Sequence, residues 1–356
     1  MSRSQADTTP KESTVIDIFL TRKHAYTVVP VPGGPIHDYD DIIRPLPYEV
    51  AAARASLPSG CYVFSDMDRL APSGLDLATA LHTGLSGDPR STVLNHPTES
   101  LARLPLLQKL EQEGVNTHRA RSMEEWGELK FPVFIREKDE HEGPITPLLY
   151  SAGEVRRAAA RLRVKGFTAK HLMVVEYRDT SDGQGLFRKY ATFRVGERFV
   201  NHHLGFTRQF IAKLSEVADE WMAQEELDFV EADANESLLR PIFDLAHIDF
   251  GRIDYTFDEG RLVVWEINVN PQLGMREPTE ALLRREPAKA IARRQLRSAL
   301  EELDSSTRVE PRPVPLHIRP SLRLQIAREN AFKEARGAWF RVTKIVAAAR
   351  RRLRVG

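Results

Sequence analysis

Three oxygen-bearing side chains in the stretch LVVWEINVNPQLG (262–274) have residue types and a spacing that could bind a cation. Glu266, Asn268 and Asn270 stand at every second position of an apolar run, so in a strand they share one face. The opposite face is then apolar and consists of Val263, Trp265, Ile267 and Val269. A buried carboxylate is costly unless it is compensated, so the stretch raises the question of what lies opposite Glu266.

A second carboxylate is expected on the same face from the preceding strand, RIDYTF (252–257). Residues 258–260, Asp-Glu-Gly, predict a three-residue hairpin loop with Gly260 at the position that needs a positive φ. That loop would place Asp254 on the face of Glu266, diagonally adjacent at roughly 7 Å. A two-residue loop would place them on opposite faces.

The oxygen atoms on this face are of the kinds that a hard cation prefers as ligands. Two carboxylates and an amide oxygen, together with phosphate oxygens, match what Mg²⁺ prefers, so we predict Asp254, Glu266 and Asn268 as metal ligands. Two carboxylates repel one another in the absence of metal, so one of them is expected to have a raised pKa. The alternative is a solvated hairpin face on which the acids are only polar.

Several other motifs are incomplete. Asp-Phe-Gly at 249–251 invites comparison with protein kinases, but neither an H-R-D loop nor a G-x-G-x-x-G loop accompanies it. The sequence has no G-x-x-x-x-G-K-[ST] phosphate loop. His202 and His203 lack a third residue at metal-ligand spacing, so they are expected to be structural or substrate-facing.

Composition describes a globular chain. With 356 residues, 42% of them hydrophobic, and a formal net charge of +1, it has room for two or three domains and is not a general polyanion binder. The single cysteine, Cys61, excludes an internal disulfide and fits a reducing compartment. No apolar run approaches about 18 residues, and the polar residues 1–14 predict a short disordered lead and a cytoplasmic protein.

The first part of the chain alternates between strand and helix patterns, which predicts a small α/β domain over 15–97. Its expected strands are 15–20, 60–66 and 91–95, and its expected helices are 48–57 and 75–85. A linking helix follows over 96–115, within a linking region 98–130, with Thr98 as its N-cap and Gly114 as its stop.

The central part of the chain carries the remaining predicted elements. These are a strand at 133–137, a helix at 153–165, a strand at 170–179, a hairpin turning at Gly196 and Glu197, helices at 207–224 and 235–248, and the strand pair described above.

The order of these elements, together with Asp254, Glu266 and Asn268, resembles the ATP-grasp superfamily of glutathione synthetase, D-alanine–D-alanine ligase and the glutamate-adding peptide ligases. In that family an Asp-ending strand, a hairpin and a Glu-x-Asn strand supply the metal ligands. The resemblance covers about residues 93–278. It implies an α/β ATP-grasp fold behind an N-terminal pre-ATP-grasp domain, with a small subdomain over 131–180, a large subdomain over 181–300, and the cofactors ATP and Mg²⁺.

The resemblance also implies nucleotide-binding positions. Arg136 stands where the family usually has Lys, and Arg103 lies in the linking helix, so both could bind ATP phosphates through paired donors. Glu176 and Tyr177 occupy the hinge that holds adenine and ribose in the family. The alternatives are an ordinary helix Arg for Arg103 and an edge-strand Glu for Glu176.

Cations on the predicted hairpin are further candidates. Lys189 could bind phosphate, and Arg194 could act in catalysis by meeting an acyl-phosphate. The alternative, which is the commoner explanation for any one such residue, is a charged hairpin face. The loop after Arg136, EKDEHEGP, has one glycine where many relatives have a glycine-rich flap. In this loop the sequence departs from the family pattern.

The function implied is an ATP- and Mg-dependent ligase that activates a small-molecule or peptide carboxylate as an acyl-phosphate for attack by an amine. The alternatives are an ATP-grasp phosphotransferase and a catalytically degenerate nucleotide-binding scaffold. No specific nucleic-acid partner is expected.

The C-terminal part, 301–356, is predicted to begin with a proline-spaced linker or surface-hugging arm. A basic amphipathic helix would end it, suited to an acidic partner or an anionic surface, or else packed back on the domain.

Overall fold

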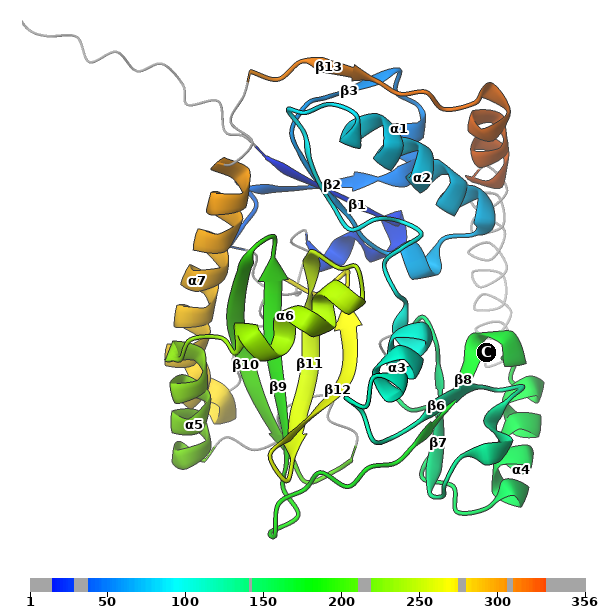
Figure 1. The fold of residues 1–356 in the computed structure, drawn as a ribbon, viewed down its shortest axis with the longest axis vertical. Coiled ribbons are helices and arrows are strands. Elements are labelled where there is room, and N and C mark those ends of the chain that lie inside the picture. The colour runs from blue at the N-terminus through cyan, green and yellow to red at the C-terminus, as the bar shows by residue number, and fades with distance from the viewer. Residues whose placement is uncertain are drawn as a thin grey trace, which may run out of the picture.

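The computed structural model describes residues 15–28, 38–140, 143–210, 219–274, 280–305 and 310–330. The predicted lead at 1–14 and the predicted basic helix near the C-terminus lie outside these ranges. Strands of the described chain form two four-stranded sheets, one three-stranded sheet and one two-stranded sheet, and helices cover them (Figure 1). The predicted mixed α/β class is confirmed.

The N-terminal part is a parallel sheet with helices packed on it. The sheet has the order β2-β1-β4-β5, from β1 (Ile16–Leu20), β2 (Ile43–Pro47), β4 (Cys61–Phe64) and β5 (Thr92–Leu94). Its helices are α1 (Tyr48–Ala52), which is shorter than predicted, and α2 (Pro72–Ser86). The sequence analysis missed β2 because its segment IRPLP contains two prolines, which are tolerated in an edge strand such as this one.

The C-terminal arm completes this N-terminal core. β13 (Pro313–Pro315) pairs with β3 (Ser56–Pro58), and a helix follows over 320–330. The buried residues of the arm are Val314, Leu316, Ile318, Leu322 and Ile326, which share one cluster with Phe19 and Phe64. Of the two alternatives for this segment, the surface-hugging arm is therefore right for 313–319, and the helix that follows was not predicted.

A small antiparallel sheet lies beside the linking helix. It has the order β6-β8-β7, from β6 (Ala120–Ser122), β7 (Val133–Glu137) and β8 (Leu172–Glu176). α4 (Ala152–Val164) packs on the face of Val133 and Ile135, while α3 (Arg103–Gln112) packs on the face of Met173 and Val175.

The linking helix is shorter than predicted. It begins at Arg103 with Ala102 as its N-cap, so the prediction of Thr98 as N-cap is wrong. Its predicted stop is confirmed, because Gly114 follows the C-cap Glu113 and has a φ of 71°.

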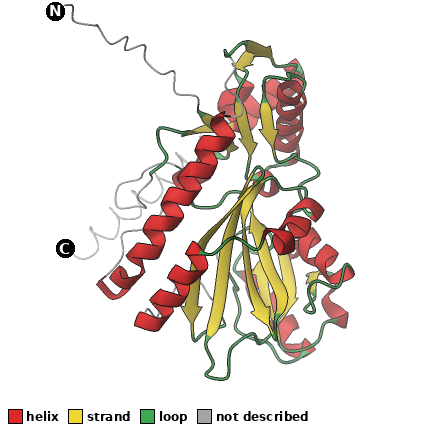
Figure 2. Ribbon diagram, turned by 60° about the vertical axis from the view of Figure 1, so that its left-hand side comes forward, coloured by secondary structure: helices red, strands yellow, loops and turns green. Residues whose placement is uncertain are grey.

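The large sheet is antiparallel, with the order β10-β9-β11-β12. Its strands are β9 (Phe187–Val195), β10 (Arg198–Thr207), β11 (Phe250–Asp258) and β12 (Arg261–Asn268). The hairpin of β9 and β10 turns at Gly196 and Glu197, as predicted. α5 (Glu220–Glu231) and the long α7 (Glu286–Ser305) lie along β10 (Figure 2).

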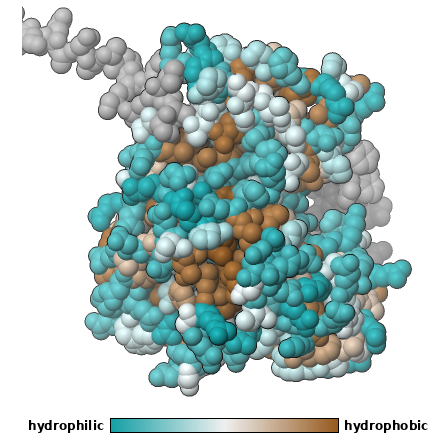
Figure 3. Space-filling model, viewed as in Figure 1, coloured by the Kyte–Doolittle hydropathy of each residue, from teal (hydrophilic) through white to brown (hydrophobic). Residues whose placement is uncertain are grey.

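The other face of the large sheet is covered in part by α6 (Glu236–Leu245). Figure 3 shows apolar side chains gathered near the middle of this face, close to α6, and Leu238 of that helix remains 38% exposed. The helix predicted over 207–224 is partly wrong, because β10 extends to Thr207 and α5 begins at Glu220; residues 211–218 lie outside the described ranges.

Short 3-10 helices complete the described chain. They are η1 (Arg22–Thr27), η2 (Met67–Arg69), η3 (Trp126–Glu128), η4 (Ala169–His171) and η5 (Glu280–Arg285). Of these, η1 and η2 follow the carboxyl ends of β1 and β4, where ligands bind in parallel α/β sheets.

Candidate functional site

The pairing of β11 with β12 brings Asp254 and Glu266 together. Asp258 pairs with Arg261, so the loop has only two residues, Glu259 and Gly260, with φ values of 50° and 79°. The predicted three-residue loop is therefore wrong. The register shifts between Tyr255 and Asp254, which leaves Trp265 as a β-bulge and pairs Asp254 directly with Glu266. The predicted shared face is confirmed, but the bulge produces it.

The bulge also changes which apolar residue of β12 enters the core. Val264 pairs with Tyr255 and joins the cluster that contains Ile253 and Ile267. The prediction that Val263 shares a face with Ile267 is wrong. The extra residue at Trp265 shifts the alternation of side chains between the two faces, so that between Trp265 and the loop the residues predicted for one face lie on the other.

Two cations flank the Asp254 carboxylate. Lys189 Nζ lies 2.9 Å from Oδ2, and Arg252 Nε lies 3.0 Å from Oδ1. Burial by itself would raise the pKa of Asp254, but Arg252 and Lys189 outweigh it and hold the pKa well below its usual range. Asp254 is therefore not the carboxylate with a raised pKa, because neighbouring cations offset its charge. Arg252 was missed from the sequence, although it lies two residues before Asp254 and therefore shares its face.

Two arginines converge on Glu266. Arg103, at the start of α3, donates from Nη2 to the Glu266 carboxylate, and Arg136 Nη2 lies 3.5 Å from the same oxygen. Arg103 Nη1 also donates to the carbonyl oxygens of Lys138 and Glu140, and each of these hydrogen bonds is 2.9 Å long. It therefore links the carboxylate to the loop that follows β7.

Arg136 occupies the centre of this cluster. Burial and the neighbouring Arg103 lower its pKa to about 10, against the opposing effect of Glu266 and Asp254. Its guanidinium remains charged at neutral pH, next to a second guanidinium. A buried and a partly buried arginine that contact the same carboxylate are an arrangement that suits a polyanionic ligand.

The two asparagines of the predicted face have different environments. Asn268 Oδ1 accepts one hydrogen bond, from the Asn270 backbone N–H at 2.9 Å, which leaves one lone pair for a cation. Asn270 instead joins the N-terminal part, donating to Asp66 at 2.8 Å and accepting from the Thr27 hydroxyl at 2.8 Å.

These residues fit a magnesium ion bound together with phosphate. Within the described ranges, no group of three or more His, Cys, Asp or Glu side chains is placed to hold a metal. Mg²⁺ is usually bound through one or two carboxylates, with waters and substrate phosphates completing its shell. Asp254, Glu266 and Asn268 supply that partial set.

The structure separates the two predicted hinge residues. Glu176 pairs with Val133 and points to the α4 face, where it accepts from the backbone N–H groups of Arg119 at 3.0 Å and Lys130 at 2.6 Å. It therefore fixes two backbone segments and does not lie beside Arg136. Tyr177 belongs to an aromatic cluster, because its ring lies 5.7 Å from that of Phe210, which is itself 6.0 Å from Phe134.

Arg194 is not brought to the site. Ala191 of β9 pairs with Asp254, so Lys189, two residues earlier, shares the site face and Arg194, three residues later, faces away. Arg194 donates to Asp244 at 2.6 Å and lies over the rings of Phe199 and Phe243.

The N-terminal part contributes polar residues that the sequence analysis did not single out. Asp66, with a φ of 57°, accepts from the Thr21 hydroxyl at 2.7 Å and from Arg69 Nη1 at 2.6 Å. A cavity of ≈ 420 Å³ lies between η1, η2 and the loop after β7. Its lining comprises Thr21, Lys23, His24, Arg69, Glu137, Asp139, Glu140 and His171. The position of Thr21, His24, Asp66 and Arg69 after the parallel strands β1 and β4 could have indicated these four residues.

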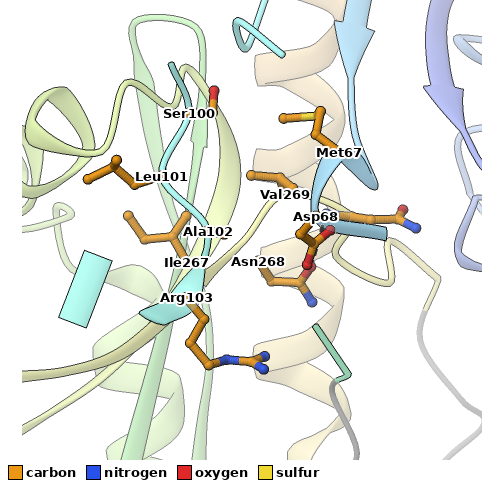
Figure 4. A pocket seen from close by; sticks show the side chains of 10 residues that line it. Met67, Asp68, Ser100, Leu101, Ala102, Arg103, Ile267, Asn268 and Val269 are labelled. Carbon is orange, nitrogen blue, oxygen red and sulfur yellow. Dashed lines mark hydrogen bonds between the residues drawn. The ribbon is translucent and has the colours of Figure 1, made fainter. Parts of the chain in front are cut away.

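A second, smaller cavity of ≈ 30 Å³ lies where η2, the start of α3 and the end of β12 meet (Figure 4). Asp68, Arg103 and Asn268 line it together, and the Asp68 side chain points toward Asn268 in this view. The N-terminal part is therefore in contact with the predicted metal and phosphate residues.

Comparisons with known proteins give distant structural similarity. No protein-family model matches the sequence, and no curated protein matches it. A D-alanine–D-alanine ligase from Coxiella burnetii is similar with a TM-score of 0.40 and 12% identity, over 69% of each chain. A D-alanine–D-alanine ligase from Bacillus anthracis is similar with a TM-score of 0.45 and 13% identity. A structure of this ligase complexed with ATP is similar with a TM-score of 0.42 and 11% identity. Both similarities extend over 83% of this chain and 97% of the other chain. The functional argument therefore depends on the side chains of this chain.

The helices of the described residues include none that is both long and apolar enough to cross a lipid bilayer.

Proposed function

We propose that this chain is an ATP- and Mg-dependent ligase of the ATP-grasp type, which activates a carboxylate as an acyl-phosphate for attack by an amine. One observation carries the proposal: four cationic side chains surround two carboxylates on a single face. The cations are Arg103, Arg136, Lys189 and Arg252, and the carboxylates are Asp254 and Glu266.

The excess of positive charge supports a polyanionic ligand. A cluster needed only for folding would be expected to balance its buried charges, because unpaired buried charge is costly. Here four cations contact two acids, with Asp68 beside Arg103 as a third acid, and a triphosphate bound with Mg²⁺ would offset the remaining positive charge. Arg103 and Arg136 are the residues that we assign to the phosphates, with Lys189 and Arg252 nearer to Asp254.

We place the nucleotide base beside Tyr177. Adenine is a flat aromatic group, and the rings of Phe134, Tyr177 and Phe210 supply aromatic surface on the Arg136 side of the small sheet. We assign Tyr177 to the nucleotide and leave Glu176 out of the site, because its carboxylate accepts hydrogen bonds from Arg119 and Lys130.

The chemistry would proceed in two transfers. A substrate carboxylate oxygen bonds to the γ-phosphorus while the bond to the bridging oxygen breaks and ADP leaves with the electron pair. The amine nitrogen then bonds to the acyl carbon, the carbon–oxygen bond to phosphate breaks, and the nitrogen loses a proton. Mg²⁺ would offset charge on the phosphate oxygens, while the arginines and Lys189 orient the transferred group and stabilise its negative charge.

The test is ADP release by the purified full chain in the presence of Mg·ATP and mixtures of carboxylic acids and amines, with product masses measured. Amide formation with equal amounts of ADP and phosphate is the expected result. Stable phosphorylated products would favour the phosphotransferase alternative. Tight ATP binding without ADP release from any mixture would favour the degenerate scaffold.

A further inference from the structure

Asp68 of η2 differs from the other acidic residues around the site. No hydrogen bond or ion pair of the described residues involves its carboxylate, although it lines the ≈ 30 Å³ cavity with Arg103 and Asn268. By contrast, Asp66 accepts from Thr21 and Arg69, Asp254 from Lys189 and Arg252, and Glu266 from Arg103.

The cations near Asp68 are committed elsewhere. Arg69 donates to Asp66 at 2.6 Å and to the carbonyl of Asp139 at 3.1 Å. Arg103 donates to Glu266 and to the loop after β7. Neither guanidinium forms an ion pair with Asp68.

The surroundings of Asp68 favour a cationic ligand. Burial of the carboxylate works against its negative charge and the neighbouring Asp66 and Asp139 repel it, while Arg69 and Arg103 favour the charge although their own hydrogen bonds go to other acceptors. A partly desolvated carboxylate without a partner is costly. A bound cation would remove that cost.

We propose that Asp68 binds the amine substrate in its ammonium form and positions it beside the carboxyl group that is activated at Arg103 and Arg136. This assignment rests on the proposed ligase function and names the substrate class of its second step: a primary amine that arrives with a positive charge. Asp68 is then a specificity-determining residue contributed by the N-terminal part.

The placement of Asp68 fits this role. The same cavity brings a cation-binding group, Asp68, next to a phosphate-binding group, Arg103, and a metal ligand, Asn268 (Figure 4). The bound ammonium must lose one proton to solvent before its nitrogen can attack the acyl carbon, and a second proton leaves the nitrogen after the attack. Until then, opposite charges on adjacent walls hold the cationic amine next to the anionic acyl-phosphate. A phosphotransferase without an amine acceptor has no use for an unpaired carboxylate at this point.

The first experiment measures binding without turnover. The full chain is labelled with ¹³C-aspartate, and the Asp68 carboxyl signal is assigned by its absence in Asp68→Asn. At pH 8, ethylammonium or 1,4-diaminobutane should shift this signal saturably, whereas MgCl₂ alone should not. Asp76→Asn, which removes an exposed aspartate of α2, is the matched control and should leave the Asp68 response unchanged.

The second experiment measures turnover. Asp68→Asn should raise the KM for a cationic amine by about tenfold or more, since one charge-assisted contact is lost. Hydroxamate formation from the same carboxylic acid and hydroxylamine, which reacts uncharged, should stay within about twofold. Asp68→Glu keeps the charge and should retain part of the amine affinity.

The outcomes separate the two proposals. The amine subsite is overturned if neither amine shifts the Asp68 signal, or if MgCl₂ without any amine shifts it. Equal losses of hydroxamate and amide formation in Asp68→Asn also overturn it, because the residue then serves activation. If wild type binds amines at Asp68 but never consumes ATP, the ligase proposal fails and the amine subsite stands.

Discussion

Asp254 and Glu266 lie directly opposite one another in the β11–β12 ladder although the hairpin loop between them has only two residues. A regular ladder with that loop would pair Asp254 with Trp265 and turn Glu266 to the other face. The bulge at Trp265 absorbs one residue and restores the shared face. Bulges re-aim side chains next to functional sites in many proteins, and here it places both candidate metal-ligating carboxylates on the face that carries Lys189 and Arg252.

The two carboxylates should be required for metal-dependent turnover. Glu266→Gln and Asp254→Asn should each abolish Mg-dependent ATP consumption while far-UV circular dichroism is unchanged. Glu259→Gln, at the exposed tip of the same hairpin, is the control and should keep full activity. Mg-dependent turnover that survives in both site variants would exclude this metal site.

Loss of Asp254 should also destabilise the protein. Asp254→Asn leaves Lys189 and Arg252 without the buried anion that they contact, so the free energy of unfolding should fall by about 3 kcal/mol. The opposite direction would be expected if repulsion between the two carboxylates dominated. Urea denaturation of wild type and variant measures it, and a more stable variant would show that repulsion between the acids dominates.

The stability contributed by Asp254 should depend on pH. Its folded-state pKa lies below its usual range, while in the unfolded chain it is about 3.9. The unfolded state therefore binds more protons on acidification, so the stabilisation is fully present above about pH 5 and declines as pH falls toward the folded-state pKa. The stability difference between wild type and Asp254→Asn should be constant from about pH 5 to 8 and shrink below about pH 4. A difference that stays constant down to about pH 3 would contradict the lowered pKa.

Arg136 and Arg194 should separate binding from stability. Arg136→Ala should weaken Mg·ATP binding by about 10- to 100-fold in calorimetry, and Arg136→Lys should recover part of it because charge remains while the paired donors are lost. Arg194→Ala should instead lower the free energy of unfolding by about 1–2 kcal/mol through the loss of its contacts to Asp244 and Phe243, with ATP affinity unchanged. Equal ATP affinity in wild type and a folded Arg136→Ala would remove Arg136 from the site.

The C-terminal arm should be part of the folding unit of the N-terminal core. Leu322→Ala removes a 5% exposed side chain from that core and should cost about 3 kcal/mol. Leu324→Ala, on the same helix but 53% exposed, should change stability by less than about 0.5 kcal/mol. Similar effects of the two substitutions in thermal unfolding would mean that the arm is not packed as described.

The sequence by itself determined several local elements and the strand face that carries the polar residues of the candidate site. The period-two alternation of apolar and polar residues identified the strands of the β9–β10 hairpin, and the same periodicity predicted that Glu266 and Asn268 share a face, because alternation in a strand is a local property. The stop of α3 at Gly114 was also readable, since a positive φ favours glycine at that position.

Only the tertiary structure decided which charges meet. The bulge at Trp265 depends on how β12 packs, and the pairing of Arg103 with Glu266 joins residues 163 positions apart. The separation of Arg194 from Lys189 follows from strand register, and Asp68 reaches Asn268 through the contact between η2 and the end of β12. Spacing along a chain fixes the face on which a side chain lies within its own strand or helix, but the packing of distant elements determines which side chains lie opposite it.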